Sequence, residues 1–233
     1  MPAERFYVDD ELNEGSRASI EGAELHHLAH VMRVGVGEKI ELVNGKGALG
    51  IANVVSIDKK KAIVELLECE KGVVGPSRFI LGIPFMRLSK LEWVIEKGTE
   101  LGADEFWIYT ADHSEKDTLS PNQTERLRYI AISAMKQSGR LDLPSFRILA
   151  HLEELFHFSG TLLFGDINPS APFIWEIKDR SFPILFVSGP EKGFSNDESK
   201  SLKIKAKGVR ISKNILRSET APISAMAILY SLC

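Results

Sequence analysis

The sequence is poor in cysteine and contains no long apolar run, and each absence excludes a class of protein. Two of its 233 residues are cysteines, Cys69 and Cys233, which is too few for a disulfide scaffold or a cysteine-based zinc site. No apolar run approaches the ~18 residues of a membrane-spanning helix, and Arg5 interrupts the position where a signal peptide would lie. A hydrophobic content of 44% and a charged content of 26% are ordinary for a folded chain. The composition predicts a globular, cytoplasmic protein without a membrane partner.

The sequence also lacks an excess of positive charge, since its formal net charge is -3. The charged residues are, however, unevenly distributed along the chain. Residues 1–75 contain 9 lysines and arginines against 13 acidic residues, whereas residues 76–233 contain 20 against 19. No acidic residue interrupts the basic stripe from Lys200 to Arg217. Such a stripe can bind phosphates, yet charge alone favours the simpler interpretation, a solvated helix face.

The first part of the chain has the pattern of a small β-barrel. Apolar or alternating runs rich in valine and isoleucine predict short strands, and turns such as Asn44-Gly45 are typical of hairpins. The predicted strands are residues 5–8, 39–43, 50–56 and 62–67, and the one predicted helix is residues 24–34. A linker rich in glycine and proline follows, so we expect two domains, residues 1–72 and residues 76–233.

Beyond the linker, strands and helices alternate. Ser89 with Glu92, and Ser195 with Glu198, have the spacing of capping boxes and predict helix starts. The predicted strands are residues 79–83, 105–109, 161–164, 184–187 and 209–211, and the predicted helices are residues 90–101, 121–137, one after residue 195 and one from residue 219 to the end. This alternation predicts an α/β domain with a largely parallel sheet, whose ligand site lies beyond the carboxyl ends of the strands.

One apparent nucleotide motif is discarded. Residues 45–50 satisfy G-x-G-x-x-G, but that motif needs a strand before it and a helix after it, and the strand-like residues 51–55 follow. We therefore expect a hairpin and not a cofactor loop. The sequence also lacks G-x-x-x-x-G-K-[ST], which argues against P-loop nucleotide hydrolysis.

A histidine cluster suggests metal binding at first sight, since His26 and His30 lie one helical turn apart with His27 between them. A zinc site needs roughly three or four ligands, and no cysteine or acidic partner at ligand spacing is evident nearby. We therefore expect helix-face packing or an RNA contact, and no metal.

Two strand–loop–helix segments are candidates for a ligand site. The strand that ends at Ser188 leads into a loop beginning with Gly189 and then into a capped helix. Glycines there let the backbone approach a ligand, although a routine strand–helix turn explains the segment equally well. The strand at residues 209–211 leads likewise into a polar loop, with Arg217 and Glu219 just before the next helix. These two form either a functional pair that faces the same crevice or an exposed ion pair worth ~0–1 kcal/mol.

A set of short motifs, in order along nearly the whole chain, carries a family resemblance. The motifs are Arg5-Phe6-Tyr7-Val8, His26-His27-Leu28, Val31-Met32-Arg33, Asn44-Gly45, residues 96–102 (EKGTELG), residues 137–140 (QSGR), residues 189–194 (GPEKGF) and residues 215–221 (ILRSETA). Together they resemble the bacterial small-subunit ribosomal RNA uridine N3-methyltransferases, which belong to the SPOUT class of S-adenosylmethionine-dependent enzymes. The last two motifs are the most specific, because they occur at the family's separation.

The resemblance implies a fold, a cofactor and partners. It implies a C-terminal SPOUT α/β trefoil-knot domain preceded by a small PUA-like RNA-binding β-barrel, acting as a homodimer on 16S ribosomal RNA in the small ribosomal subunit. Three loops that leave the sheet would hold S-adenosyl-L-methionine through Leu163, Phe164, Gly165, Ser188, Gly189, Pro190, Gly193, Ile211, Asn214, Ile215, Leu216 and Thr220. The residues implied to bind RNA are Arg5, His27, Arg33, Lys97, Gln137 and Arg140.

The resemblance also implies methyl transfer to uridine N3, which carries a proton at neutral pH. Arg217 is the candidate for neutralising charge on the uracil oxygens, and Glu219 or Glu191 is the candidate base. A purely structural role for either carboxylate fits the sequence as well.

Two alternatives to this function stay open. One is a ribose 2′-O-methyltransferase of the same class, and the other is a non-catalytic RNA-binding factor in ribosome assembly. Lys192, where the family usually has a glycine, is the one hint of the latter. A second departure is Gly98, which replaces an alanine within a predicted helix at a propensity cost of ~1 kcal/mol.

Overall fold

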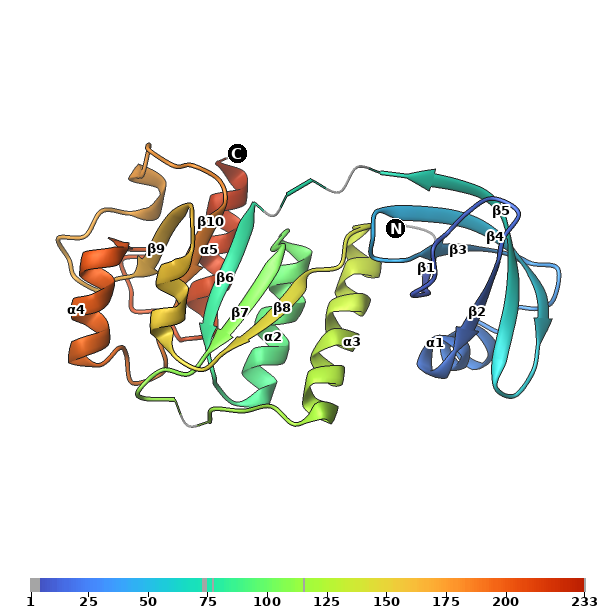
Figure 1. Ribbon diagram of the computed structural model, residues 1–233, viewed down its shortest axis with the longest axis horizontal. Helices are drawn as coiled ribbons and strands as arrows, with labels where there is room; N and C mark the ends of the chain where they lie inside the picture. Colours follow the sequence, from blue (N-terminus) through green and yellow to red (C-terminus); the bar gives the residue numbers. More distant parts are fainter. Residues whose placement is uncertain (1–4, 73–74, 77, 115, 233) are drawn as a thin grey trace. The chain divides into compact units, whose positions relative to one another are not determined.

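The computed structural model describes residues 5–72, 75–76, 78–114 and 116–232 of the chain. The chain forms two compact units, drawn in Figure 1. The first unit comprises Met1–Gly75 and Ile132–Leu143, and the second comprises Pro76–Ala131 and Pro144–Cys233. None of the helices described is both long and apolar enough to span a bilayer.

The first unit is built on a five-stranded sheet in the order β1-β3-β4-β5-β2. The strands are β1 (Arg5–Tyr7), β2 (Arg17–Glu21), β3 (Lys39–Val43), β4 (Ala48–Ile57) and β5 (Lys61–Lys71). β1 runs parallel to β3, and the other neighbours pair antiparallel. The register of the β4–β5 pair shifts twice, and such bulges bend a sheet. Alternate side chains, among them Leu42, Val54 and Val64, are fully buried on one face and form the core of this unit.

The discarded motif at residues 45–50 is a hairpin, as predicted. The Asn44 side-chain oxygen accepts hydrogen bonds from the backbone N–H of Lys46 at 2.9 Å and of Ala48 at 3.2 Å. Gly45 and Gly47 have φ values of 68° and 89°, which glycine adopts at little cost. β4 begins at Ala48, so no helix follows the glycines.

The predicted helix at residues 24–34 is irregular. α1 (Gly22–His26) continues into a π-helical segment, η1 (His27–Val31). Leu25 and Leu28 are buried in the core of the first unit. Arg33 then adopts a φ of 55°, a left-handed conformation that stops the helix at that point.

The second unit is built on a six-stranded sheet in the order β11-β9-β10-β6-β7-β8, with all neighbours parallel. The strands are β6 (Phe79–Pro84), β7 (Glu105–Tyr109), β8 (Ser145–Leu149), β9 (Thr161–Gly165), β10 (Ile184–Val187) and β11 (Lys207–Val209). The predicted parallel sheet is therefore confirmed. Strand order reverses between β6 and β10, and open α/β sheets bind their ligands at such a switch point.

Helices cover both faces of this sheet (Figure 1). The helices of this unit are α2 (Leu88–Glu100), α4 (Asn196–Lys205), α5 (Thr220–Ser231) and the 3₁₀ segments η2 (Leu152–His157) and η3 (Ile174–Glu176). A further helix, α3 (Pro121–Ser138), begins in this unit, and its residues from Ile132 on belong to the first unit. α4 and η2 bury one face, where Leu202 packs in one cluster with Ile80 and Leu185. α2 and α5 contact each other, and α5 also contacts β6 and β10.

The two predicted capping boxes have different outcomes. Ser195 caps α4: its hydroxyl accepts the Glu198 backbone N–H at 3.2 Å, and its own N–H donates to the Glu198 carboxylate at 2.7 Å. The box predicted at Ser89 is wrong, because α2 begins at Leu88, two residues before the predicted start, so Ser89 lies inside the helix. The Glu92 carboxylate accepts instead from the guanidinium of Arg126 at 3.1 Å.

Gly98 lies where α2 approaches the sheet most closely. A Cβ at this position would lie 2.7 Å from Cε1 of Phe106 and 3.2 Å from Cδ1 of Leu81, both of which are buried. Glycine at this position therefore permits a helix–sheet contact that a methyl group would obstruct.

We expect Gly98→Ala to lower the free energy of unfolding by about 1–3 kcal/mol, although alanine gains ~1 kcal/mol of helix propensity. The buried Phe106 ring must shift to admit the methyl group. In a Phe106→Leu background the same substitution should cost less, because the obstructing ring is gone. Urea denaturation followed by circular dichroism measures both effects. A Gly98→Ala protein more stable than the parent would contradict the close packing.

Candidate functional site

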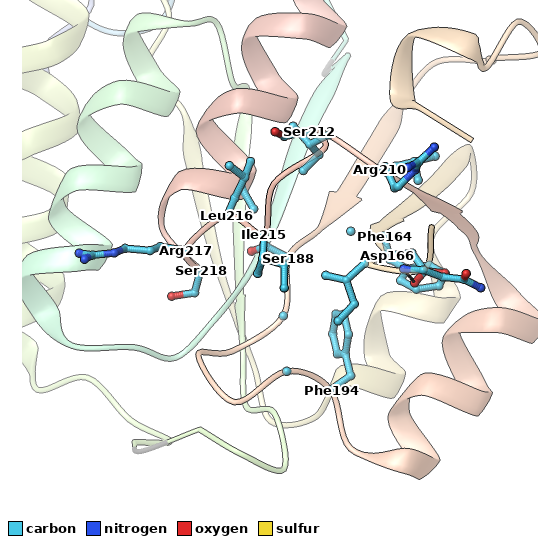
Figure 2. A pocket seen from close by; sticks show the side chains of 18 of the residues that line it. Phe164, Asp166, Ser188, Phe194, Arg210, Ser212, Ile215, Leu216, Arg217 and Ser218 are labelled. Atoms are coloured by element: carbon cyan, nitrogen blue, oxygen red, sulfur yellow. Dashed lines mark hydrogen bonds between the residues drawn. The ribbon is translucent and has the colours of Figure 1, made fainter. Parts of the chain in front are cut away.

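A cavity of about 1150 Å³ lies at the carboxyl ends of β9, β10 and β11. Three loops line it: residues 164–169, residues 188–194 and residues 209–218 (Figure 2). β9 lies between β10 and β11, and all three strands are parallel. Their carboxyl ends therefore share one edge of the sheet and bring together segments that are distant in sequence. This is the edge at which the alternating pattern places a ligand site.

The structure gathers ten of the twelve residues predicted to bind the cofactor. The ten that line the cavity are Phe164, Gly165, Ser188, Gly189, Pro190, Gly193, Ile211, Asn214, Ile215 and Leu216. Leu163 lies outside the lining, because its side chain is fully buried in β9. Thr220 also lies outside it, at the start of α5.

The loop after β10 is held in place by hydrogen bonds to the backbone of its first residue. The Ser188 N–H donates to the Gly82 carbonyl at 2.9 Å, and the Ser188 carbonyl accepts from the Tyr109 hydroxyl at 2.7 Å. Burial and the nearby Glu198 carboxylate raise the pKa of Tyr109 well above its usual value, so the hydroxyl stays protonated and donates. This fixes the point at which the chain leaves the sheet.

The segment that follows β7 supports the same loop. The Asp112 carboxylate accepts from the Ser195 hydroxyl at 2.5 Å, and the Asp112 N–H donates to the buried Glu198 carboxylate at 2.9 Å. His113 Nδ1 lies 2.9 Å from the Gly193 carbonyl oxygen. These contacts hold both ends of the segment from Gly193 to the start of α4.

The loops after β9 and β11 are also cross-linked. The Asp166 N–H donates to the Val209 carbonyl at 2.9 Å. The Arg210 guanidinium donates to the Ala171 carbonyl at 2.8 Å and lies 4.1 Å from the centre of the Phe173 ring. Sequence reasoning missed Asp166 and Arg210 as lining residues, although each directly follows the end of a strand.

The lining combines apolar side chains with peptide groups. Ile215, which is 80% exposed, lies beside Leu216 on the loop after β11, and the Phe194 ring faces the same cavity (Figure 2). Gly189 packs tightly on that ring, since a Cβ there would lie 3.1 Å from Phe194 Cε2. The cavity therefore offers apolar surface next to backbone donors and acceptors, a combination typical of small-molecule sites.

Three charged side chains meet at one side of the cavity. Lys90, in the first turn of α2, places Nζ 2.8 Å from Glu191 Oε1 and 3.1 Å from Glu219 Oε2. Burial raises the pKa of each carboxyl, but hydrogen bonds from Lys90 and from backbone N–H groups outweigh it and leave both pKa values below their usual range. Hydrogen bonding to Glu191 and Glu219 raises the pKa of Lys90. All three groups are therefore charged at neutral pH.

Arg217 lies at the rim of the cavity. Its carbonyl accepts the N–H groups of Thr220 and Ala221, both at 3.0 Å, and so begins α5. Its side chain is exposed and points away from Ser188 and Phe194 (Figure 2). No hydrogen bond or ion pair to another described residue engages its guanidinium group.

The residues predicted to bind RNA lie elsewhere, outside the described lining of the cavity. Arg5, His27, Arg33, Gln137 and Arg140 belong to the first unit, and Lys97 lies on α2 in the second. Several are held by acids: Arg5 pairs with Glu41 at 2.9 Å, Arg140 with Asp142, and Lys97 with Glu96 and Glu100. Their role in RNA binding stays a prediction. Within the part of the chain that the structure describes, no group of three or more candidate metal ligands occurs.

Comparison with known proteins places this cavity in context. A family model described as an RNA methyltransferase domain matches residues 75–230, and one described as an RNA methyltransferase PUA domain matches residues 20–67. A relative from Synechocystis, named ribosomal RNA small subunit methyltransferase E, is 30% identical over 99% of this chain and 78% of its own length. One of the same name from Bacillus subtilis is 27% identical over 96% of this chain and 94% of its own.

Solved structures agree with these matches. The crystal structure of a ribosomal RNA small subunit methyltransferase E from Neisseria gonorrhoeae bound to S-adenosyl methionine has a TM-score of 0.89, with 27% identity over 99% of this chain and 98% of that one. A probable rRNA-methyltransferase from Porphyromonas gingivalis has a TM-score of 0.85, with 26% identity over 98% of each chain. The predicted fold class, a SPOUT α/β domain after a PUA-like domain, is thereby confirmed.

We expect Tyr109→Phe to lower the free energy of unfolding by about 1–3 kcal/mol, because the buried Ser188 carbonyl loses its donor. Tyr129→Phe is the matched control, since Tyr129 is 41% exposed on α3 and loses the same atom at the surface. Thermal and urea unfolding of both variants measure the difference. Equal stability of the two variants would contradict the role given to the Tyr109 hydroxyl.

Proposed function

Because the chain belongs to the ribosomal RNA small subunit methyltransferase E family, we propose that it transfers the methyl group of S-adenosylmethionine to N3 of a uridine in 16S ribosomal RNA. The single observation that carries this proposal is the cavity formed by the loops after β9, β10 and β11. The cavity lies within the part of the chain matched by the RNA methyltransferase family model.

The residues of the cavity fit S-adenosylmethionine. Ile215, Leu216 and Phe194 offer apolar surface for an adenine ring, and the loops beside them offer backbone groups for its polar edge. Asp166 and Lys203 supply both signs of charge, which suits a cationic sulfonium with a zwitterionic tail. When bound, S-adenosylmethionine supplies an electrophilic methyl group.

The chain's part in the reaction is to position the uracil and to stabilise its negative charge. Loss of the N3 proton leaves charge on the uracil oxygens, and the exposed Arg217 guanidinium at the rim can neutralise it. Holding the nucleophile and the methyl group in line supplies much of the acceleration.

Glu191 and Glu219 are the candidate acceptors of the N3 proton. Their lowered pKa values keep them ionised at neutral pH, as a base requires. The same lowering weakens them as proton acceptors, because each carboxylate is engaged by Lys90. The carboxylate that acts as the base must therefore give up part of its interaction with Lys90 when it accepts the N3 proton.

The proposal extends to partners. Residues 1–72 would bind 16S ribosomal RNA in the small ribosomal subunit as a PUA-like domain, with residues 76–233 carrying the chemistry. The protein would act as a homodimer. α5 supports this in part, because it buries Ala225, Met226 and Leu229 yet leaves Tyr230 59% exposed.

Mass spectrometry of nucleosides from small-subunit ribosomal RNA, with and without the gene, tests the function. We expect N3-methyluridine to be lost without the gene and restored by the parent protein. Arg217→Met should fail to restore it at equal protein level, since removing a transition-state donor costs about 100-fold or more in rate. Lys200→Met is the control, because it removes one charge, paired with Asp197, from an exposed position on α4.

Two results would contradict the proposal. Loss of a ribose-methylated nucleoside instead would indicate the 2′-O-methyltransferase alternative. No change in any methylated nucleoside would indicate a non-catalytic assembly factor.

A further inference from the structure

Lys90 connects two loops that are far apart in sequence. Its helix, α2, begins shortly after β6, the strand next to β10 in the sheet. Its Nζ reaches Glu191 in the loop after β10 and Glu219 just before α5. Lys90 and Glu191 both line the cavity, and Glu219 directly follows the loop at residues 209–218 that lines it.

The two salt bridges of Lys90 are partly shielded from water. The side chains of Lys90, Glu191 and Glu219 are 27%, 37% and 14% exposed. Lys97 on the same helix also binds two carboxylates, but both belong to α2 itself and hold no loop. The contacts of Lys90 differ because they join separate elements of the fold.

Without Lys90 the two carboxylates would repel each other. Burial raises the pKa of both carboxyls, Lys90 lowers both, and the charge of Glu219 raises the pKa of Glu191. The neighbouring Lys192 and Arg217 are exposed. Like charges in a partly buried site raise each other's pKa and separate where the chain allows it. Here separation would move the loops at Gly189 and Leu216 apart and widen the cavity.

We propose that Lys90 is a positioning residue that holds the loops after β10 and β11 at the separation needed to bind S-adenosylmethionine. This inference rests on the proposed function. In this role Lys90 sets the spacing of the two loops, so the distance between Glu191 and Glu219 determines how tightly the ligand binds.

Calorimetric titration of S-adenosylmethionine into the purified full chain tests the inference. Lys90→Met should weaken binding about tenfold, the size of a coupled charge interaction. Lys90→Arg, which keeps the charge, should stay within about threefold of the parent. Lys200→Met should bind as the parent does, since Lys200 pairs with an exposed aspartate on α4.

A second-site variant separates repulsion from a simple loss of packing. Lys90→Met combined with Glu191→Gln leaves one carboxylate and should recover binding to within about threefold of the parent. For the same reason, Lys90→Met should regain affinity relative to the parent at acidic pH, where a carboxylate takes up a proton and the repulsion is lost. If Lys90→Met weakened binding only because the lysine side chain left an unfilled space, neither the second substitution nor the lower pH would restore affinity.

The outcomes distinguish the two proposals. A parent protein that does not bind S-adenosylmethionine would overturn the proposed function and this inference with it. A parent that binds, with Lys90→Met binding equally well or the double variant binding no better than Lys90→Met, would overturn the inference alone. If Lys90→Met does not fold, as judged by circular dichroism, the double variant decides by itself: near-parental affinity supports the inference, and lost affinity contradicts it.

Discussion

The parallel alignment of β9, β10 and β11 is the constraint on which the site depends. Three strands that run the same way must release their chains at one edge, so three loops from residues 164 to 218 meet around one cavity. Hydrogen bonds then fix the residues at which the chain leaves these strands. Tyr109 holds Ser188, and Asp166 is bound to Val209, so the loops are placed by the sheet rather than by a ligand.

The charged side chains beside the cavity hold its loops in position and also include the candidate catalytic groups. Lys90 binds Glu191 and Glu219 and keeps both ionised, which ties their possible use as bases to the position of the loops they belong to. Arg217 contrasts with them, because its guanidinium is exposed at the rim. One side of the cavity therefore carries two carboxylates that a single lysine compensates in part, and the rim carries a cation available to a polyanionic substrate.

Local hydrogen-bonded features and the parallel sheet were predictable from the sequence, whereas individual contacts between distant residues were not. The Asn44 turn and the Ser195 cap are confirmed, because each depends on hydrogen bonds within four residues. β8 was missed, since this edge strand is largely exposed and lacks an apolar run. The family resemblance implied the ten cofactor-binding residues that line the cavity, and five of these lie within the two most specific motifs, residues 189–194 and 215–221. The role of Lys90 was not predicted, because its partners lie 101 or more residues away and no sequence motif links them to it.

The central claim is that the cavity at the carboxyl ends of β9, β10 and β11 binds S-adenosylmethionine. Hydrogen–deuterium exchange of the full chain, with and without this ligand, tests it most directly. The account predicts slower amide exchange in peptides covering residues 164–169, 188–194 and 209–218, and unchanged exchange in the β4–β5 hairpin. Protection confined to the first unit, or no protection at saturating ligand, would contradict it.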